Sequence, residues 1–180
     1  MRLSSLSSMT STIRLPDAMP DVSRPTLLVV CDSHHCRFLN VGGHAIVEKE
    51  TLSSSEPVFT DRQDSFGGRG GTAVGVGEKD QVESHRLKEF SNTVVKHLEG
   101  VVRSEKVEAL HIAAPGKFLS SLKDHLSTAL TKILVQTIDG NFAKEQPLAL
   151  LVRFRPDLKA AVEKLRDQEN YSPSNLPPKK

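Results

Sequence analysis

Large aromatic residues are scarce in this chain of 180 residues, which contains seven Phe, one Tyr and no Trp. About 37% of the residues are hydrophobic, which is enough for one core, and the length is that of a single domain. The core must therefore be built mainly from Leu, Val, Ile and Ala. A sheet covered by helices suits that composition.

The chain also lacks the features of disulfide-rich secreted proteins and of membrane proteins. Its two cysteines, Cys31 and Cys36, are too few to staple a secreted fold. No stretch approaches the roughly 18–20 consecutive apolar residues that a membrane span requires. Residues 1–24 are rich in Ser and Thr and have no secretory apolar run, so we expect a disordered leader, a targeting segment or a mis-assigned start there. We expect a cytoplasmic protein without membrane contact.

A clustered excess of positive charge is missing from the central part of the chain. Residues 26–142 carry 13 Lys and Arg against 15 Asp and Glu, whereas residues 143–180 carry 8 against 5. A protein that wraps a nucleic-acid backbone normally needs a clustered basic face. The net charge of +2 therefore comes from the ends, and composition alone gives no support to nucleic-acid binding.

Three strands are expected first, beginning at Pro25. Residues 26–31 form a continuous apolar run rich in β-branched side chains, which is typical of a strand buried on both faces. Residues 36–41 predict a second strand, and two glycines then supply a tight turn. Residues 44–52 alternate apolar and polar side chains, so they predict an exposed third strand. The economical arrangement is a meander of three antiparallel strands.

Helices and strands are expected to alternate after the meander. Between about residues 82 and 104, apolar residues recur at steps of three and four and form one stripe of a helix. A strand at 107–114, a helix that begins at Pro115 and a strand at 133–138 follow. The predicted fold class is α/β with a single mixed β-sheet, an antiparallel meander followed by strand, helix, strand, helix, strand. Residues 25–155 are its expected domain, and residues 156–180 are expected to form a charged helix and a disordered tail.

The segment between the meander and the first helix, residues 53–82, has no sustained periodicity. Six of the chain's 11 glycines lie between positions 67 and 77. Glycine loses more conformational freedom on folding than any other residue, so this segment contributes little to stability. It is either a solvated flexible loop or a functional one, used as a lid, for close backbone approach to a ligand, or as an N–H cradle for an anion. Arg62 and Arg69 would add phosphate contacts.

Familiar cofactor and catalytic motifs do not fit this sequence. A dinucleotide-binding fingerprint needs glycines directly after a buried strand, and the Pro-Gly-Lys-Phe at 115–118 is only a fragment of a P-loop. Cys31 and Cys36, with two histidines between them, have no second ligand pair for zinc. No nucleophile, base and acid stand out as a set, and the Gly-x-Ser-x-Gly elbow is absent. We expect no cofactor, no metal and no catalytic residues.

Several segments nevertheless follow a known order and spacing. They are Leu-Leu-Val-Val at 27–30 followed by Asp32, Arg-Phe-Leu at 37–39, Asp-Arg at 61–62, Gly-Arg-Gly-Gly at 68–71, Glu-Ser-His-Arg-Leu at 83–87, Leu-His-Ile-Ala-Ala-Pro at 110–115, and Phe-Leu-Ser-Ser-Leu at 118–122. This series, over about residues 26–153, resembles the bacterial host attachment protein family, described as proteins required for attachment to host cells. It also resembles, more distantly, the middle domain of archaeal and eukaryotic peptide release factors.

The resemblance implies an RNase H-like mixed sheet and, for the release-factor domain, a loop carrying Gly-Gly-Gln. That glutamine acts where peptidyl-tRNA is hydrolysed. Gly70 and Gly71 match the two glycines, but Thr72 occupies the glutamine position, and the alternative pair at 67–68 is followed by Arg69. A threonine hydroxyl is shorter than a glutamine amide and cannot orient a water in the same way. We therefore do not expect peptide release by the release-factor mechanism.

Two functions remain open from the sequence. The first is a non-catalytic interaction protein of the host attachment family that docks to the ribosome or tRNA through its glycine-rich loop. The residues of this binding loop are Arg62, Gly67, Gly68, Arg69, Gly70, Gly71 and Thr72. The second is a hydrolase acting on RNA or an ester with that loop as a lid. An RNase H-like nuclease would need several carboxylates holding Mg²⁺ on adjacent strands, and only Asp32 and Asp139 lie at suitable strand ends.

Overall fold

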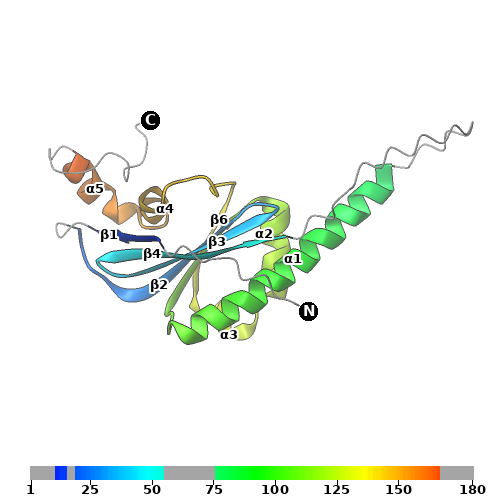
Figure 1. The fold of residues 1–180 in the computed structure, drawn as a ribbon, viewed down its shortest axis with the longest axis horizontal. Coiled ribbons are helices and arrows are strands. Elements are labelled where there is room, and N and C mark those ends of the chain that lie inside the picture. Colours follow the sequence, from blue (N-terminus) through cyan, green and yellow to red (C-terminus); the bar gives the residue numbers. More distant parts are fainter. Residues whose placement is uncertain (1–10, 16–18, 55–75, 167–180) are drawn as a thin grey trace, which may run out of the picture.

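Six strands form one mixed sheet with helices on both of its faces in the computed structural model (Figure 1). The structure describes residues 11–15, 19–54 and 76–166. The strand order is β1-β4-β3-β2-β5-β6. The predicted fold class, α/β with a single mixed sheet, is confirmed.

The expected meander consists of β2 (Val22–Cys31), β3 (His35–Gly43) and β4 (Ala45–Ser53). The three strands pair antiparallel in chain order. β2 lies in the middle of the sheet, between β3 and β5, so its residues from Leu27 to Cys31 are fully buried on alternating faces. This position explains the continuous apolar run in its sequence.

A fourth strand of this group, β1 (Ser11–Arg14), pairs antiparallel with β4 at one edge of the sheet. Leu15 and Met19 follow it and are only 1% and 2% exposed, packed in the core. The expectation of a disordered leader at 1–24 therefore differs from the structure over residues 11–15 and 19–24. Four polar-rich residues carry little local strand signal, and it is pairing and burial that order them.

The second half of the sheet is built by two parallel crossovers. After α1 (Val76–Ser104), β5 (Ala109–Ala114) lies parallel to β2, and β6 (Leu134–Asp139) then lies parallel to β5. The predicted helix between these two strands is divided into α2 (Gly116–His125) and α3 (Thr128–Ile133). The division occurs because Leu126 and Ser127 both have extended backbone conformations.

Helices cover the sheet unequally, and each face has its own core. On one face α1, α2 and α3 pack on the side chains of Leu27, Val29 and Ile112. On the other face α4 (Pro147–Phe154), the short 3₁₀ helix η1 (Pro156–Leu158) and α5 (Lys159–Arg166) pack on Leu28, Val30 and Ala113. The two sets alternate along β2 and β5, as the two-residue period of a strand requires.

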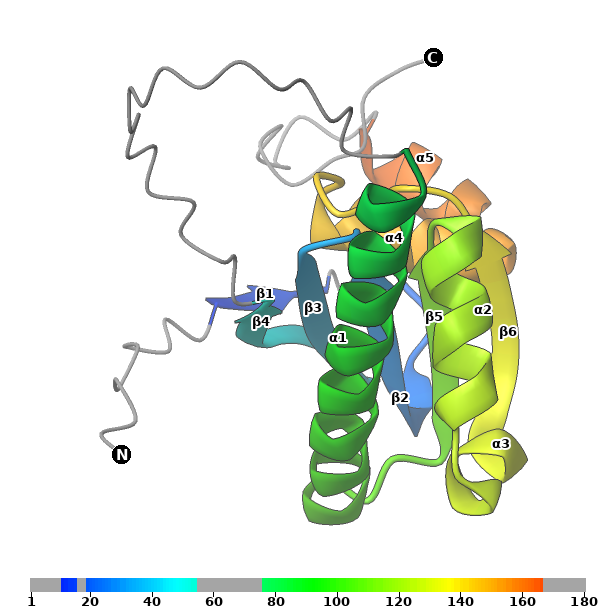
Figure 2. The same ribbon diagram turned by 90° about the vertical axis from the view of Figure 1, so that its right-hand side faces the viewer.

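The parallel strands β2, β5 and β6 end at the same edge of the sheet, which we call the carboxyl edge. α1 leads into β5 through a connection at the opposite edge, and α2 begins directly after β5 at the carboxyl edge, so the two helices run side by side on one face of the sheet (Figure 2). The first turns of α1 project beyond the sheet (Figure 1). Ligands of open α/β sheets commonly bind outside the carboxyl ends of the strands. The search for a functional site therefore begins there.

Candidate functional site

The residues of the predicted binding loop all lie outside the described part of the chain. They are Arg62, Gly67, Gly68, Arg69, Gly70, Gly71 and Thr72. The described residues that flank them are Ser54, after β4, and Val76, at the start of α1. Ser54 lies at the carboxyl edge, where β4 ends beside the β2–β3 turn, and the side chains around this edge define the remaining site.

Asp32, the first of the two candidate carboxylates, closes the turn between β2 and β3. Its Oδ1 atom accepts hydrogen bonds from the backbone N–H groups of His34 and His35, at 2.7 and 2.6 Å, and lies 3.4 Å from Nδ1 of His35. Partial burial acts to raise the pKa of Asp32. The two backbone N–H groups and the His35 ring outweigh burial, so this pKa lies below its ordinary value. Asp32 is thus an ionised structural acceptor.

The same turn holds the residue that precedes the glycine-rich segment. The backbone N–H of Ser54 donates to the carbonyl oxygen of His34 at 2.7 Å, and Oγ of Ser54 lies 3.4 Å from Nδ1 of His34. These contacts fix the end of β4 against the β2–β3 turn. Ser54, the last described residue before 55–75, is therefore held at the carboxyl edge.

Asp139, the second candidate carboxylate, ends β6 beside the start of α2. A Cβ atom placed on Gly116 would lie only 3.0 Å from Oδ2 of Asp139, so a glycine there permits this close approach. A carboxylate at the first turn of a helix is stabilised by the helix dipole. Asp139 therefore lies directly against the first residue of α2.

The two carboxylates share the carboxyl edge but follow strands that are not neighbours. β5 lies between their strands, which separates Asp32 from Asp139 by two strand spacings, or about 10 Å. Among the described residues, no group of three or more His, Cys, Asp or Glu side chains could hold a metal ion. The nuclease hypothesis has no ligand set in this part of the chain.

Cys31 and Cys36 lie directly opposite each other on β2 and β3, with their Cα atoms 4.1 Å apart. Both are fully buried in the core beneath α1, and the structure joins them in a disulfide. The neighbouring His34 and His35 are exposed at the turn. The cysteines thus act in packing and cross-linking of the meander, consistent with the buried position expected for Cys31.

His111 is a buried polar side chain on β5 that faces the opposite core. Its ring packs against Phe154 of α4, with the centroids 5.3 Å apart, and Nδ1 has no hydrogen-bond partner among the described residues. Burial lowers the pKa of His111, the positive charge of Arg155 lowers it further, and a hydrogen bond with Gln136 opposes both. The neutral imidazole is therefore favoured in the folded protein.

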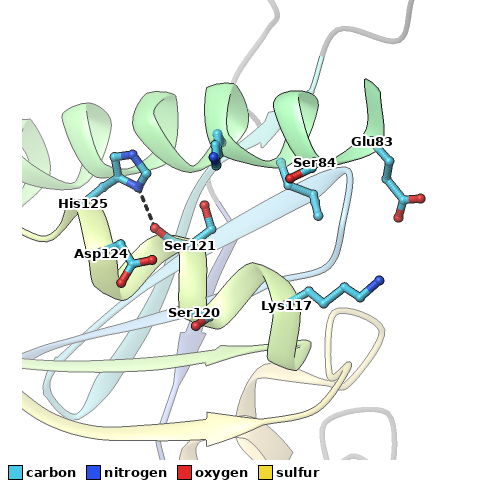
Figure 3. A pocket seen from close by; sticks show the side chains of 9 residues that line it. Glu83, Ser84, Lys117, Ser120, Ser121, Asp124 and His125 are labelled. Carbon is cyan, nitrogen blue, oxygen red and sulfur yellow. Dashed lines mark hydrogen bonds between the residues drawn. The ribbon is translucent and has the colours of Figure 1, made fainter. Parts of the chain in front are cut away.

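A groove of about 510 Å³ lies between α1 and α2 (Figure 3). It is lined by hydroxyl, ammonium, carboxylate and imidazole groups around one apolar side chain. The lining residues are Glu83, Ser84, Leu87 and Lys88 from α1, and Lys117, Ser120, Ser121, Asp124 and His125 from α2. Glu83 and Lys117 lie toward one end of the groove, and Asp124 and His125 lie toward the other.

The walls of this groove are held by contacts between the two helices. The rings of Phe90 and Phe118 stack with their centroids 5.3 Å apart, and the hydroxyls of Ser91 and Ser121 lie 2.8 Å apart. On α2 itself, Nδ1 of His125 lies 2.6 Å from the carbonyl oxygen of Ser121. Because a carbonyl only accepts, Nδ1 must carry the proton, and a neutral His125 ring presents Nε2 as an acceptor.

The groove was not predicted from the sequence. The helix expected at about residues 82–104 was recognised by its apolar stripe, and no role was given to the polar side chains on its other faces. A usable signal was present in α2, where Lys117, Ser121 and His125 recur at four-residue intervals along one face. The sequence does not show, however, that this polar stripe faces α1.

Comparison with known proteins places the chain in a family. A model of the bacterial archaeo-eukaryotic release factor family 12 matches residues 25–151, and the chain belongs to this family. This supports the release-factor side of the resemblance, whereas the host attachment name stays a prediction. No curated protein matches the chain in sequence.

Two solved structures are similar to the chain at low identity. The crystal structure of an archaeal translation termination factor, aRF1, is 13% identical with a TM-score of 0.42, and the match covers 83% of this chain and 36% of that one. A structure described as an archaeal protein is 12% identical with a TM-score of 0.39, covering 86% and 45%. The chain therefore spans less than half the length of either structure. No helix among the described residues is long and apolar enough to cross a membrane.

Proposed function

We propose that this protein docks to the ribosome or to tRNA as a non-catalytic interaction protein. The observation that carries the proposal is the family match over residues 25–151, since the family is named for its relation to archaeo-eukaryotic release factors. The docking residues would be those of the segment between β4 and α1. They are Arg62, Gly67, Gly68, Arg69, Gly70, Gly71 and Thr72.

The anchoring of this segment supports the proposal. Ser54, the last described residue before the segment, is fixed to the β2–β3 turn through His34, and α1, which follows the segment, packs against α2. Two guanidinium groups, from Arg62 and Arg69, suit bidentate contacts with phosphate, and glycines leave backbone N–H groups free to approach it. Phosphate contacts of this kind position a protein on a nucleic acid without reading its sequence.

The residue types at the site favour docking over catalysis. Thr72 stands where the release-factor motif has glutamine, and its hydroxyl is too short to orient a water in the same way. Asp32, which a nuclease would need as a metal ligand, instead accepts two backbone hydrogen bonds of a turn, and Asp139 lies against Gly116 at the start of α2. The hydrolase alternative therefore draws no support from them. Any effect on attachment to host cells would be an indirect consequence of docking.

The test is co-sedimentation with ribosomes on a sucrose gradient at low and at higher salt. Wild-type protein is compared with a variant that carries Arg62→Ala, Arg69→Ala, Gly70→Ala and Gly71→Ala. We expect wild-type protein to sediment with ribosomes at low salt and to dissociate at higher salt, because phosphate contacts release counterions. The variant is expected to remain at the top of the gradient at both salts.

A matched control also removes two positive charges, but at positions outside the glycine-rich segment. Arg103→Ala with Lys132→Ala changes two exposed residues near the ends of α1 and α3, at the sheet edge away from the glycine-rich segment. This control should sediment like wild type. If the control and the loop variant lose binding equally, the association depends on general charge and the assignment to the loop is wrong.

A further inference from the structure

We propose that the groove between α1 and α2 binds a ribose-phosphate unit of single-stranded RNA. The inference rests on the proposed function for its choice of RNA as the source of that unit. The choice of a ribose-phosphate unit follows from the groove, because its lining combines cations, carboxylates and hydroxyls.

The cations come from both helices and suit the phosphate. Lys88 on α1 and Lys117 on α2 each line the groove, and neither forms an ion pair among the described residues. Lysine is a common phosphate ligand that acts as a mobile point charge. A phosphate between the helices would be within reach of an ammonium group on either side.

The carboxylates argue against a bare anion and for a sugar. Glu83 and Asp124 also line the groove, so the charges of the acidic and lysine side chains cancel. Ionised carboxylates accept hydrogen bonds but cannot donate them. The ribose hydroxyls donate, and hydrogen bonds to a charged acceptor are the stronger kind. Deoxyribose lacks the 2′ donor, so the groove should distinguish RNA from DNA.

The size and rigidity of the groove suit a unit of this kind. Its volume of about 510 Å³ lies within the range of roughly 300–1,000 Å³ for small-molecule sites. Leu87 supplies an apolar surface among the polar groups, which a sugar or base can cover. The Phe90–Phe118 stack and the Ser91–Ser121 contact fix the helices, so little ordering is needed on binding.

The groove is also continuous with the edge proposed for docking. Lys117 is the second residue of α2, which begins at the carboxyl edge after β5, and Glu83 lies at the same end of the groove (Figure 3). A strand of RNA that contacts this edge can therefore place one nucleotide in the groove. His125 at the far end offers Nε2 as a further acceptor for a hydroxyl.

The test is fluorescence anisotropy with a short labelled oligouridylate and with the oligodeoxyuridylate of the same length. We expect wild-type protein to bind the RNA about tenfold more tightly, the effect of one hydrogen bond to a charged group. Asp124→Ala should lower this RNA preference severalfold. Lys117→Ala should weaken both probes and reduce the slope of log affinity against log salt by about 0.7, the value for one phosphate contact on a single strand.

The control is Lys123→Ala, which removes an exposed lysine of the same helix that does not line the groove. It should keep both the affinity and the RNA preference. Competition with uridine monophosphate distinguishes a free nucleotide from a strand of RNA as the source of the ribose phosphate. If the monomer displaces the labelled probe fully, the groove takes one nucleotide.

Equal binding of RNA and DNA, no binding of either, or an Asp124→Ala variant with unchanged preference would each overturn the groove assignment. The ribosome sedimentation test uses variants of the glycine-rich segment and not of the groove. Either the docking proposal or the groove proposal can therefore fail without the other. Loss of sedimentation in the loop variant with intact oligonucleotide binding supports both. Sedimentation without oligonucleotide binding contradicts only the groove.

Discussion

Asp32 shows how a side chain with a catalytic appearance in the sequence can have a structural role. It follows a buried strand at the carboxyl edge, which is where a metal-binding carboxylate is expected in many α/β proteins. In the structure its Oδ1 atom accepts from two backbone N–H groups of the turn, those of His34 and His35. The sequence indicated the position of this carboxylate correctly but not its partners.

Asp32→Ala should therefore reduce the free energy of unfolding. Removing the acceptor leaves two backbone N–H groups without their partner, at an expected cost of about 1–2 kcal/mol. Asp32→Asn should cost less, because the amide oxygen still accepts. Urea denaturation at neutral pH measures both values. An Ala variant as stable as wild type would contradict the structural role.

His111 gives the folded protein a sensitivity to mild acid. Its pKa is lowered in the folded state, so below about pH 6.5 the unfolded chain binds a proton that the folded chain does not. Stability should therefore fall as the pH drops from about 7 to about 5. Asp32 has a lowered pKa as well, but its contribution is lost only at lower pH, near the ordinary range of a carboxyl group.

The variant His111→Leu isolates this effect. Leucine fills part of the same space against Phe154 and cannot titrate. The loss of stability between about pH 7 and pH 5 should be smaller in the variant than in wild type, measured by urea denaturation at each pH. An identical loss in both proteins would mean that His111 is not the titrating group.

At the scale of elements, the apolar periodicity of the sequence was informative. Steps of three and four predicted α1, and a continuous apolar run predicted the central position of β2, because both patterns report which side chains are buried. Polar side chains carry no such signal. The groove between α1 and α2 could not be predicted for this reason, since only the tertiary packing shows which polar stripes face each other.

Short elements escaped prediction for a related reason. β1 has four residues, and its order depends on pairing with β4 and on the burial of Leu15. The division between α2 and α3 occurs at Leu126 and Ser127 without a Gly or Pro to mark it. Local propensity is a weak guide where tertiary contacts decide the backbone conformation.

Leu15→Ala tests whether the N-terminal segment belongs to the folded core. Leu15 is only 1% exposed and packs in the core beneath α4 and α5. We expect the substitution to lower the free energy of unfolding by about 2–5 kcal/mol, as for other buried leucines. Thr12→Ala, at an exposed position of β1, should change it by only about 0.5 kcal/mol. If both substitutions change the free energy of unfolding by equally small amounts, the N-terminal segment is not part of the core and the expectation of a disordered leader is correct.

At the scale of the whole molecule, the three layers bring separate chemical groups to one edge. The β2–β3 turn, the start of α2 and Ser54, which precedes the segment at 55–75, all lie at the carboxyl edge. The central part of the chain is faintly acidic, so contacts with a polyanion must depend on a few local cations. Association with ribosomes should therefore have a modest salt dependence.

The central claim is that this chain binds the translation machinery, and the most direct measurement is the affinity of the wild-type protein for purified ribosomes at several salt concentrations. We predict binding at low salt with a slope of log affinity against log salt of about −1.4 to −1.8, the value for two phosphate contacts. An absence of binding at every salt concentration would contradict the claim, whatever the properties of the groove.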